Sequence, residues 1–461
     1  MRRGSLIGPL LLIVVGLLFL ASNLRPELPI LELIGMHWPW VLIGWGFIRV
    51  AEITLWHTSG KPLPVNGVSG GEWTLVVFLC LLGSSVFYAH HYRDRINVIG
   101  FRGLEEVLGE SHDVTHKEVS IAAGKTPRVL IESFRGDARI VGADTETVKA
   151  SGRSTVRALS QKEAGEMLGK ASLEVVRQGD LIVIRTNQDR LDRNRKVQAT
   201  LEIAVPRGAS LEARGRYGDF DISDLAGNVS VDSDNAGVRA SNIGGNVRVD
   251  TRRGDIVRAQ NVKGTVELRG GGEDIELDTV AGTVMIEGRY SGEIKLRALA
   301  KAVRVQESNT EFRAESVPGQ IVVGRGNVDG TGLTGPSTVR ARSRDVSLRD
   351  CTGSISVEVE RGDVELRPGR LPLAKVDVRT KSGDIRFEVP EGAAFSIKGS
   401  SPKGEVDNQY GAPLEQNSRK IEGKVGTGPE VTLTSERGRI VVSKGEAGKT
   451  PVSKPGPATS L

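Results

Sequence analysis

The feature that most constrains the fold of this chain is an apolar pair in strand alternation that recurs every nine or ten residues. The first members of successive pairs are Phe220, Val229, Val238, Val247, Ile256, Val266, Ile275, Val284, Ile294, Val303, Phe312 and Ile321. A unit this short holds one strand and one turn, so it cannot bury its apolar side chains alone. Stacked units bury them in one continuous column. The pattern predicts a mainly β protein, a parallel β-helix or β-solenoid.

Two alternatives share this spacing. An antiparallel meander and a β-sandwich also place strands about 8–12 residues apart. The constancy of the interval over a dozen units favours the solenoid over both. The interval leaves open whether two or three units complete one turn. The register loosens near residues 326–336 and then resumes at Val346, Ile355, Val364 and Ile385.

Glycine punctuates the repeat, and the chain contains 57 glycines. Most units open with one, as at Gly227, Gly245, Gly254 and Gly282. We expect these glycines to supply the positive φ of a tight corner, which a following Asn or Asp also tolerates. Val, Ile and Leu fill the apolar positions, and such small side chains suit a narrow core.

The N-terminal part of the chain has the composition of a membrane protein. Leu6–Leu24 is almost wholly apolar and long enough to cross hydrocarbon. Trp38–Trp56 is a second apolar stretch, and Trp73–Ala89 is a third. All five tryptophans lie in the first 73 residues, at or near the ends of these stretches, as an aromatic belt requires. We therefore expect about three transmembrane helices.

The second stretch contains two charged residues, Arg49 and Glu52. They can reach the membrane interface or pair on one helix face. A charged residue inside a membrane span is a candidate functional contact, so this pair is the candidate site for an intramembrane partner.

Three spans with an internal N-terminus place the large C-terminal region outside a bacterial cytoplasmic membrane. The basic residues flanking the spans are balanced, four against four, so the positive-inside rule does not decide the orientation. If the second stretch only dips into the membrane, the C-terminal region is cytoplasmic.

Composition changes along the chain predict five parts. They are a transmembrane module at 1–92 with helices at 6–24, 38–56 and 73–89, a juxtamembrane linker at 93–126, a β-rich entry region with one short helix at 127–206, a β-solenoid at 207–444, and a disordered Pro/Gly/Ser-rich tail at 445–461.

Catalytic and metal-binding patterns are scarce. Two cysteines, Cys80 and Cys351, form no disulfide framework or zinc motif. The last histidine is His116, which removes Ser-His-Asp and Cys-His chemistry from the repeat. His112 and His116 would share a helix face, but solvated linker histidines are the favoured interpretation. We expect no cofactor, no metal and no enzymatic activity.

A glycan-active β-helix enzyme is the remaining catalytic alternative, since such enzymes use paired carboxylates. The candidate carboxylates lie at solvated corners without tryptophan platforms, and they are Asp219, Asp221, Asp224, Asp232 and Asp234.

Two further motifs have structural explanations. The Arg-Gly-Asp tripeptides at 135–137, 253–255 and 361–363 reuse the repeat's own Gly-Asp corner. Gly270–Asp278 departs from the calcium-binding nonapeptide, because Glu273 stands where glycine is needed.

The net charge of +5 is not concentrated in a basic stripe, so nucleic acid is not an expected partner.

Two resemblances follow from these residues. The stretch "VPRGASLEARGRYGDFDIS", the repeated Gly-x-Val-x-Val units and the closing "GTGPEVTLTSERGRIVVSK" resemble the DUF4097 family of bacterial β-strand-repeat proteins, over about residues 127–444. That resemblance implies a β-helical fold, an envelope location and an adhesin-like role without catalytic residues. Residues 5–56 resemble the LiaF/LiaI-type transmembrane region of envelope-stress proteins, which implies a regulatory alternative.

The sequence thus predicts a membrane-anchored bacterial envelope protein whose solenoid binds a protein or cell-wall partner. The alternative is a sensory or regulatory subunit of an envelope-stress response that acts through its transmembrane region.

Overall fold

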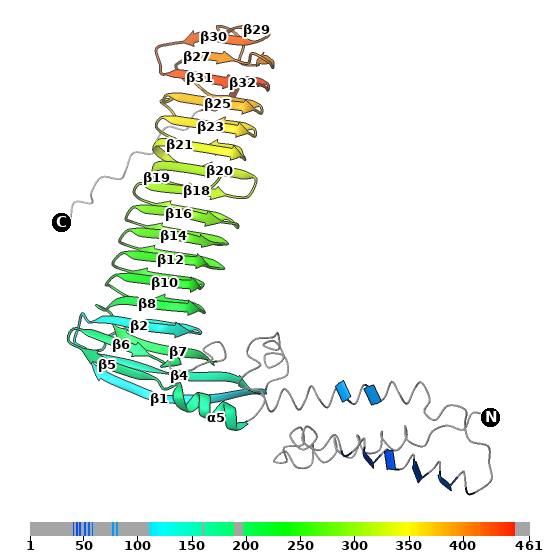
Figure 1. The fold of residues 1–461 in the computed structure, drawn as a ribbon. Coiled ribbons are helices and arrows are strands. Elements are labelled where there is room, and N and C mark those ends of the chain that lie inside the picture. The colour runs from blue at the N-terminus through cyan, green and yellow to red at the C-terminus, as the bar shows by residue number, and fades with distance from the viewer. Residues whose placement is uncertain are drawn as a thin grey trace, which may run out of the picture. The chain divides into compact units, whose positions relative to one another are not determined.

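The computed structural model describes residues 110–158, 161–188 and 197–447, together with separate helical residues between positions 40 and 81 (Figure 1). The chain divides into two compact units, Met1–Gly109 and Glu110–Leu461.

The described residues of the first unit are helical and lie within 40–58 and 76–81. Large apolar side chains are exposed on them, including Trp40 at 67% and Phe47 at 73%. None of the helices described is both long enough and apolar enough to span a bilayer. The expected segment at 6–24 lies outside the described residues, as do Arg49 and Glu52.

The second unit is a β-solenoid with two strands in each coil, one on each of two facing sheets. From residue 210 to residue 307, sheet B contains β8 (Ser210–Tyr217), β10 (Val229–Asn235), β12 (Val247–Arg253), β14 (Val266–Gly272), β16 (Val284–Tyr290) and β18 (Val303–Glu307). Sheet A contains β9 (Phe220–Ser223), β11 (Val238–Ile243), β13 (Ile256–Val262), β15 (Asp274–Val280) and β17 (Ile294–Leu299). Figure 1 shows the sheet B strands stacked in one column.

Successive strands within each sheet are parallel and aligned so that apolar residues meet apolar residues. In sheet B, Val229 pairs with Val247, which pairs with Val266. Each step advances the chain by 18 or 19 residues, so two of the short repeat units complete one coil. The paired valines are 1% exposed or less and form the continuous core. The structure thereby settles the number of units in a turn, which the interval left open.

The glycines that open the units have two roles, and only one of them is the expected one. Gly218, Gly362 and Gly383 have a positive φ at Gly-Asp corners, as expected. Gly227, Gly245, Gly264 and Gly282 are not among the residues with positive φ. They are needed because adjacent coils approach too closely for a side chain. A Cβ at Gly282 would lie 2.2 Å from the carbonyl oxygen of Gly264 in the coil before it. Positive φ also falls on a neighbouring corner column made of Asp224, Asn242, Asn261, Thr279 and Ala298.

One coil of the solenoid runs backwards. β19 (Thr310–Val323) is a single long strand that pairs antiparallel to β18 in sheet B and to β17 in sheet A. Its other edge pairs antiparallel to β20 (Asn327–Thr331) and β21 (Thr334–Ser343). Because the direction is reversed twice, β20 and β21 resume the original winding. This reversal accounts for the loosened register near residues 326–336.

The coils after the reversal again alternate between the two sheets. They contain β22 (Asp345–Arg349), β23 (Ile355–Arg361), β24 (Val364–Arg367), β25 (Val376–Ser382) and β26 (Ile385–Glu391). Their pairings are parallel, as in Val346 with Val364 and Ile355 with Val376.

The N-terminal end is interlocked, because strands out of sequence order share the first coils. β2 (Arg128–Arg135) lies between β6 (Leu181–Arg185) and β8, and β3 (Ala138–Ala143) lies between β7 (Val197–Pro206) and β9. Antiparallel strands continue outward, with β4 (Thr147–Ala158) beside β7, β1 (Glu110–Ala122) beside β4, and β5 (Glu174–Gln178) beside β6.

The expected short helix is present as α5 (Gln161–Lys170). Its buried residues Ala164 and Leu168 pack on Val156 and Val197, so the helix covers the inner face at this end of the solenoid.

The C-terminal end is interlocked in the same manner. β31 (Glu430–Ser435) lies between β25 and β27 (Phe395–Ser400), while β32 (Ile440–Ala447) lies between β26 and β28 (Val406–Asn408). β30 (Lys420–Val425) and β29 (Glu415–Asn417) then close sheet B with antiparallel pairs. Of the expected tail, residues 448–461 lie outside the described residues.

The expected domain bounds differ from this arrangement in two places. Residues 110–122, assigned to the linker, form β1. The boundary between entry region and solenoid at 206 does not separate two sheets, because β2 bonds directly to β8 across it. Strand alternation locates a strand but does not tell which later strand it will join.

Candidate functional site

The outer faces of the solenoid carry ion pairs that join neighbouring coils. Arg258 pairs with Glu276 at 2.7 Å, Arg239 pairs with Asp219 at 3.1 Å, and Arg367 bridges to Glu388 at 3.1 Å. These groups are exposed and screened, so each pair contributes little stability. The described faces are therefore polar and mixed in charge, without a one-sided basic or acidic stripe along the whole column.

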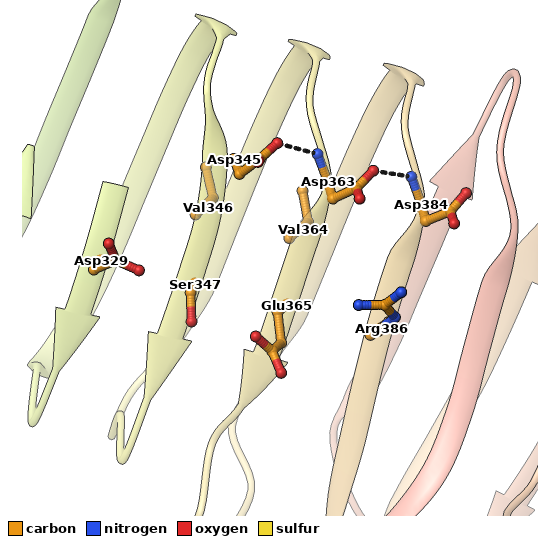
Figure 2. A pocket seen from close by; sticks show the side chains of 9 residues that line it. All are labelled: Asp329, Asp345, Val346, Ser347, Asp363, Val364, Glu365, Asp384 and Arg386. Carbon is orange, nitrogen blue, oxygen red and sulfur yellow. Dashed lines mark hydrogen bonds between the residues drawn. The ribbon is translucent and has the colours of Figure 1, made fainter. Parts of the chain in front are cut away.

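An acidic groove of about 190 Å³ lies on the outer side of sheet A (Figure 2). Its floor is formed by Asp329, Ser347, Glu365 and Arg386, which lie on the adjacent strands β20, β22, β24 and β26. The short side chain of Ser347 leaves the space between its longer neighbours.

The rim of the acidic groove is a ladder of aspartates, as Figure 2 shows. The Asp345 carboxylate accepts the backbone N–H of Asp363 at 2.9 Å, and the Asp363 carboxylate accepts that of Asp384 at 2.8 Å. Asp384 then accepts the N–H of Arg439 at 2.7 Å. Each carboxylate thus accepts a hydrogen bond from a backbone N–H group at the corner of the next coil. Among the described residues, no group of three or more His, Cys, Asp or Glu side chains is placed to hold a metal ion.

The structure disperses the carboxylates considered for glycan chemistry. Asp219 accepts the Gly237 N–H and pairs with Arg239 at one corner, whereas Asp224 accepts the amide of Asn242 at the other. Asp234 pairs with Arg252 on sheet B. Asp221 and Asp232 lie on the outer faces of β9 and β10 in different sheets. No acid and base pair is assembled from this set.

The Arg-Gly-Asp tripeptides lie at coil corners. Arg135 is only 7% exposed, and the Asp137 carboxylate accepts the backbone N–H of Asp219. Asp363 belongs to the aspartate ladder. In the tripeptides that end at Asp137 and Asp363, the aspartate joins two coils, which agrees with the corner interpretation.

The stretch Gly270–Asp278 is occupied by internal contacts. Asp274 accepts the backbone N–H of Glu293 at 2.8 Å. Asp278 forms a close ion pair with Arg297, and this hydrogen bond lowers the pKa of the Asp278 carboxyl. Its carboxylates therefore hold adjacent coils together.

His112 and His116 lie on a strand, β1, and not on a helix. The His116 Nε2 lies 2.7 Å from the Ser154 Oγ of β4. This pair is not an accessible nucleophile, because Ser154 is 0% exposed. The contact joins the outermost strand of sheet A to its neighbour.

His116 gives this end of the solenoid a pH dependence. Burial lowers the pKa of His116 below its ordinary value of 6.5. The unfolded chain therefore binds the proton more readily, and stability falls as the pH drops below about 6.5 until the folded-state pKa is passed. We expect His116→Gln to lose less stability than the parent between pH 7.5 and pH 5. Urea-unfolding midpoints at both pH values measure this difference. An equal loss of stability on acidification in both proteins would contradict the prediction.

A buried ion pair is the site that sequence reasoning missed. The Arg344 Nη2 lies 2.9 Å from the Glu307 carboxylate, and their side chains are 7% and 8% exposed. Arg344 Nη1 is buried without a hydrogen-bond partner. The pair spans the reversed strand, joining the end of β18 to the corner before β22. Nothing distinguishes these two residues in a chain with so many arginines and glutamates.

Residues 193–443 match the family model described as Toastrack DUF4097. The chain belongs to the Toastrack DUF4097 family. The match covers more than half of the chain, from just before β7 to β32. The interlocked coil of β2 and β3 precedes the matched residues, although it is bonded into the same sheets as the Toastrack repeat.

Solved structures of low identity are also similar to this chain. One is a "putative cell adhesion protein" from Clostridium sporogenes, with 11% identity, a TM-score of 0.18, and coverage of 71% of this chain and 99% of that chain. Another is a "putative adhesin" from Bacteroides fragilis, with 8% identity, a TM-score of 0.18, and coverage of 72% and 97%. Likeness at this level carries no functional conclusion for the Toastrack chain. No curated protein matches it.

Proposed function

We propose that this chain is a membrane-anchored protein of the bacterial envelope whose solenoid is a non-catalytic interaction domain. The observation that carries the proposal is the contrast between the two units. The second unit presents polar faces whose carboxylates join coils, whereas the first exposes large apolar side chains on its helical residues. Trp40, Phe47, Leu55 and Leu81 are each 65% exposed or more. Apolar helix surfaces of this kind suit a lipid environment.

The solenoid faces suit binding to an extended partner, either a protein or a cell-wall polymer. Stacked coils give long regular surfaces, which repeat proteins use for recognition. The regular repeat of the Toastrack family supports a binding role of this kind.

Protease accessibility tests the location. In intact spheroplasts, we expect added protease to reach the solenoid, because three spans would place it on the external side. Cleavage is followed by immunoblotting with a C-terminal epitope, and a cytoplasmic marker protein controls for lysis. A solenoid that is protected until the membrane is permeabilised would overturn the external location without affecting the fold.

A regulatory role through the membrane module is the second candidate. It rests on the likeness of residues 5–56 to the LiaF/LiaI-type region and on the pair Arg49 and Glu52. In this role the two charges contact a membrane partner. Replacing both with leucine should abolish partner co-purification and the stress response. If the double variant retains both partner co-purification and the stress response, this role for the pair is excluded.

A further inference from the structure

The outermost strand of sheet A has an unpaired edge. Among the described strands, β1 pairs only with β4, and this pairing extends from Glu110 to Ala122 with a register shift between His116 and Val119. The backbone N–H and C=O groups on its other side have no strand partner in the described part of the chain. A long open edge of this kind is a template for pairing with another strand.

The other ends of the two sheets are much shorter. At the C-terminal end, sheet A finishes with the three residues of β28 and sheet B with the three residues of β29. At the N-terminal end, sheet B finishes with the five residues of β5. Short edge strands discourage association. β1 has 13 residues, so shortness does not protect it, and the stretch from Glu110 to His116 pairs regularly with β4.

The side chains of β1 are complementary to themselves when two copies run antiparallel. With Thr115 opposite Thr115 of a second copy, Asp113 lies opposite Lys117, and Lys117 lies opposite Asp113. Opposite charges directly across an antiparallel pair stabilise it, and like charges weaken it. All three side chains are exposed and belong to the outer row of the strand. Val114, one of the few large apolar residues exposed on the second unit at 39%, gains cover in the same arrangement.

The helix at this end leaves the edge accessible. α5 packs through Ala164 and Leu168 on the inner face of β4 and β7, which is a face of sheet A and not its edge. A partner strand can therefore extend sheet A in its own plane.

We propose that two copies of this chain associate by pairing their β1 edges, antiparallel and centred on Thr115, so that sheet A continues from one copy into the other. The partner is a second copy because the register that opposes Asp113 and Lys117 is generated by the strand's own sequence. A symmetric pair forms both contacts at once.

Disulfide trapping tests the register. In a Cys80→Ser background, Thr115→Cys places two thiols directly opposite each other across the twofold axis. Directly opposed Cα atoms lie about 4.5–5.5 Å apart, within reach of a disulfide. The matched control is Arg153→Cys, since Arg153 is the β4 neighbour of Thr115. The introduced cysteines of the two copies would be about 15 Å apart in this control, because each lies one strand further from the twofold axis.

We expect the full-length protein in native membranes to form a disulfide-linked dimer with Thr115→Cys and not with Arg153→Cys. Equal cross-linking of both variants, or of neither, would overturn the proposal.

Charge reversal provides an independent measurement. Lys117→Asp places Asp113 opposite an aspartate, so we expect at least a tenfold loss of Thr115→Cys cross-linking. The double change of Asp113→Lys with Lys117→Asp restores complementarity and should restore the dimer. Failure of the double variant to recover, while its circular dichroism spectrum and melting curve match those of the parent, would also reject the register. A β1 edge that captures a different protein would appear as heterologous cross-links from Thr115→Cys, and that outcome too would refute self-pairing.

Discussion

Replacing Glu307 with alanine is expected to destabilise the solenoid by about 3–5 kcal/mol, because the buried guanidinium of Arg344 then loses its counter-charge. The two side chains are less than a tenth exposed, and one guanidinium nitrogen already lacks a partner. The loss should appear in the urea-unfolding midpoint followed by circular dichroism.

The solenoid supplies a matched control for this change. Arg258 and Glu276 form a pair of the same type between adjacent coils, but their side chains are 48% and 42% exposed. Glu276→Ala should therefore cost at most about 1 kcal/mol. Replacing both Glu307 and Arg344 with leucine should recover most of the loss, since no isolated charge remains. If Glu307→Ala and Glu276→Ala had similar effects, burial of the Glu307 pair would be energetically unimportant.

The second large effect is expected at the glycine column. A Cβ at Gly282 would lie 2.2 Å from the carbonyl oxygen of Gly264 and 2.6 Å from the backbone nitrogen of Thr265. These are main-chain atoms, so relief requires the coils to move apart. Gly282→Ala should cost about 3 kcal/mol, at the upper end of overpacking effects.

Gly326→Ala is the control for this substitution. Gly326 has open space around the position of a Cβ, and its φ is not in the positive region. We expect its unfolding midpoint to equal that of the parent or to rise slightly, because alanine reduces the entropy of the unfolded chain. Equal losses in the two variants would show that coil separation is not the constraint at Gly282.

The interval of the repeat predicted the fold because burial imposes the same alternation on every coil. Strands begin at or beside the first apolar residue of nearly all the predicted units. One unit is shifted by a residue, since Val257 is buried where Ile256 was expected. The glycines were located correctly, and the positive φ expected of them is present at Gly218, Gly362 and Gly383. The close approach of coils at Gly282 was not expected, because a sequence does not display how near two coils lie.

The repeat interval could not predict the direction of each strand or the order of the strands in the two sheets. The spacing continues from Val303 to Phe312 and Ile321, yet the last two residues belong to one strand that runs backwards. An apolar residue packs equally well in either direction, so the period is unchanged. The contact of His116 with Ser154 and the pair of Glu307 with Arg344 depend on which strands become neighbours. No local pattern encodes those pairings.

The interlocked C-terminal coil bears on how this protein resists being pulled apart. An enzyme that unravels proteins from a free end grips the last residues and draws them away. In a simple stack it would remove one coil at a time, breaking a single ladder of hydrogen bonds at each step. Here the last strand, β32, is held by β26 on one side and by β28 on the other. The first pull must therefore break two ladders together, and so must the next one, because β31 is likewise held by β25 and β27.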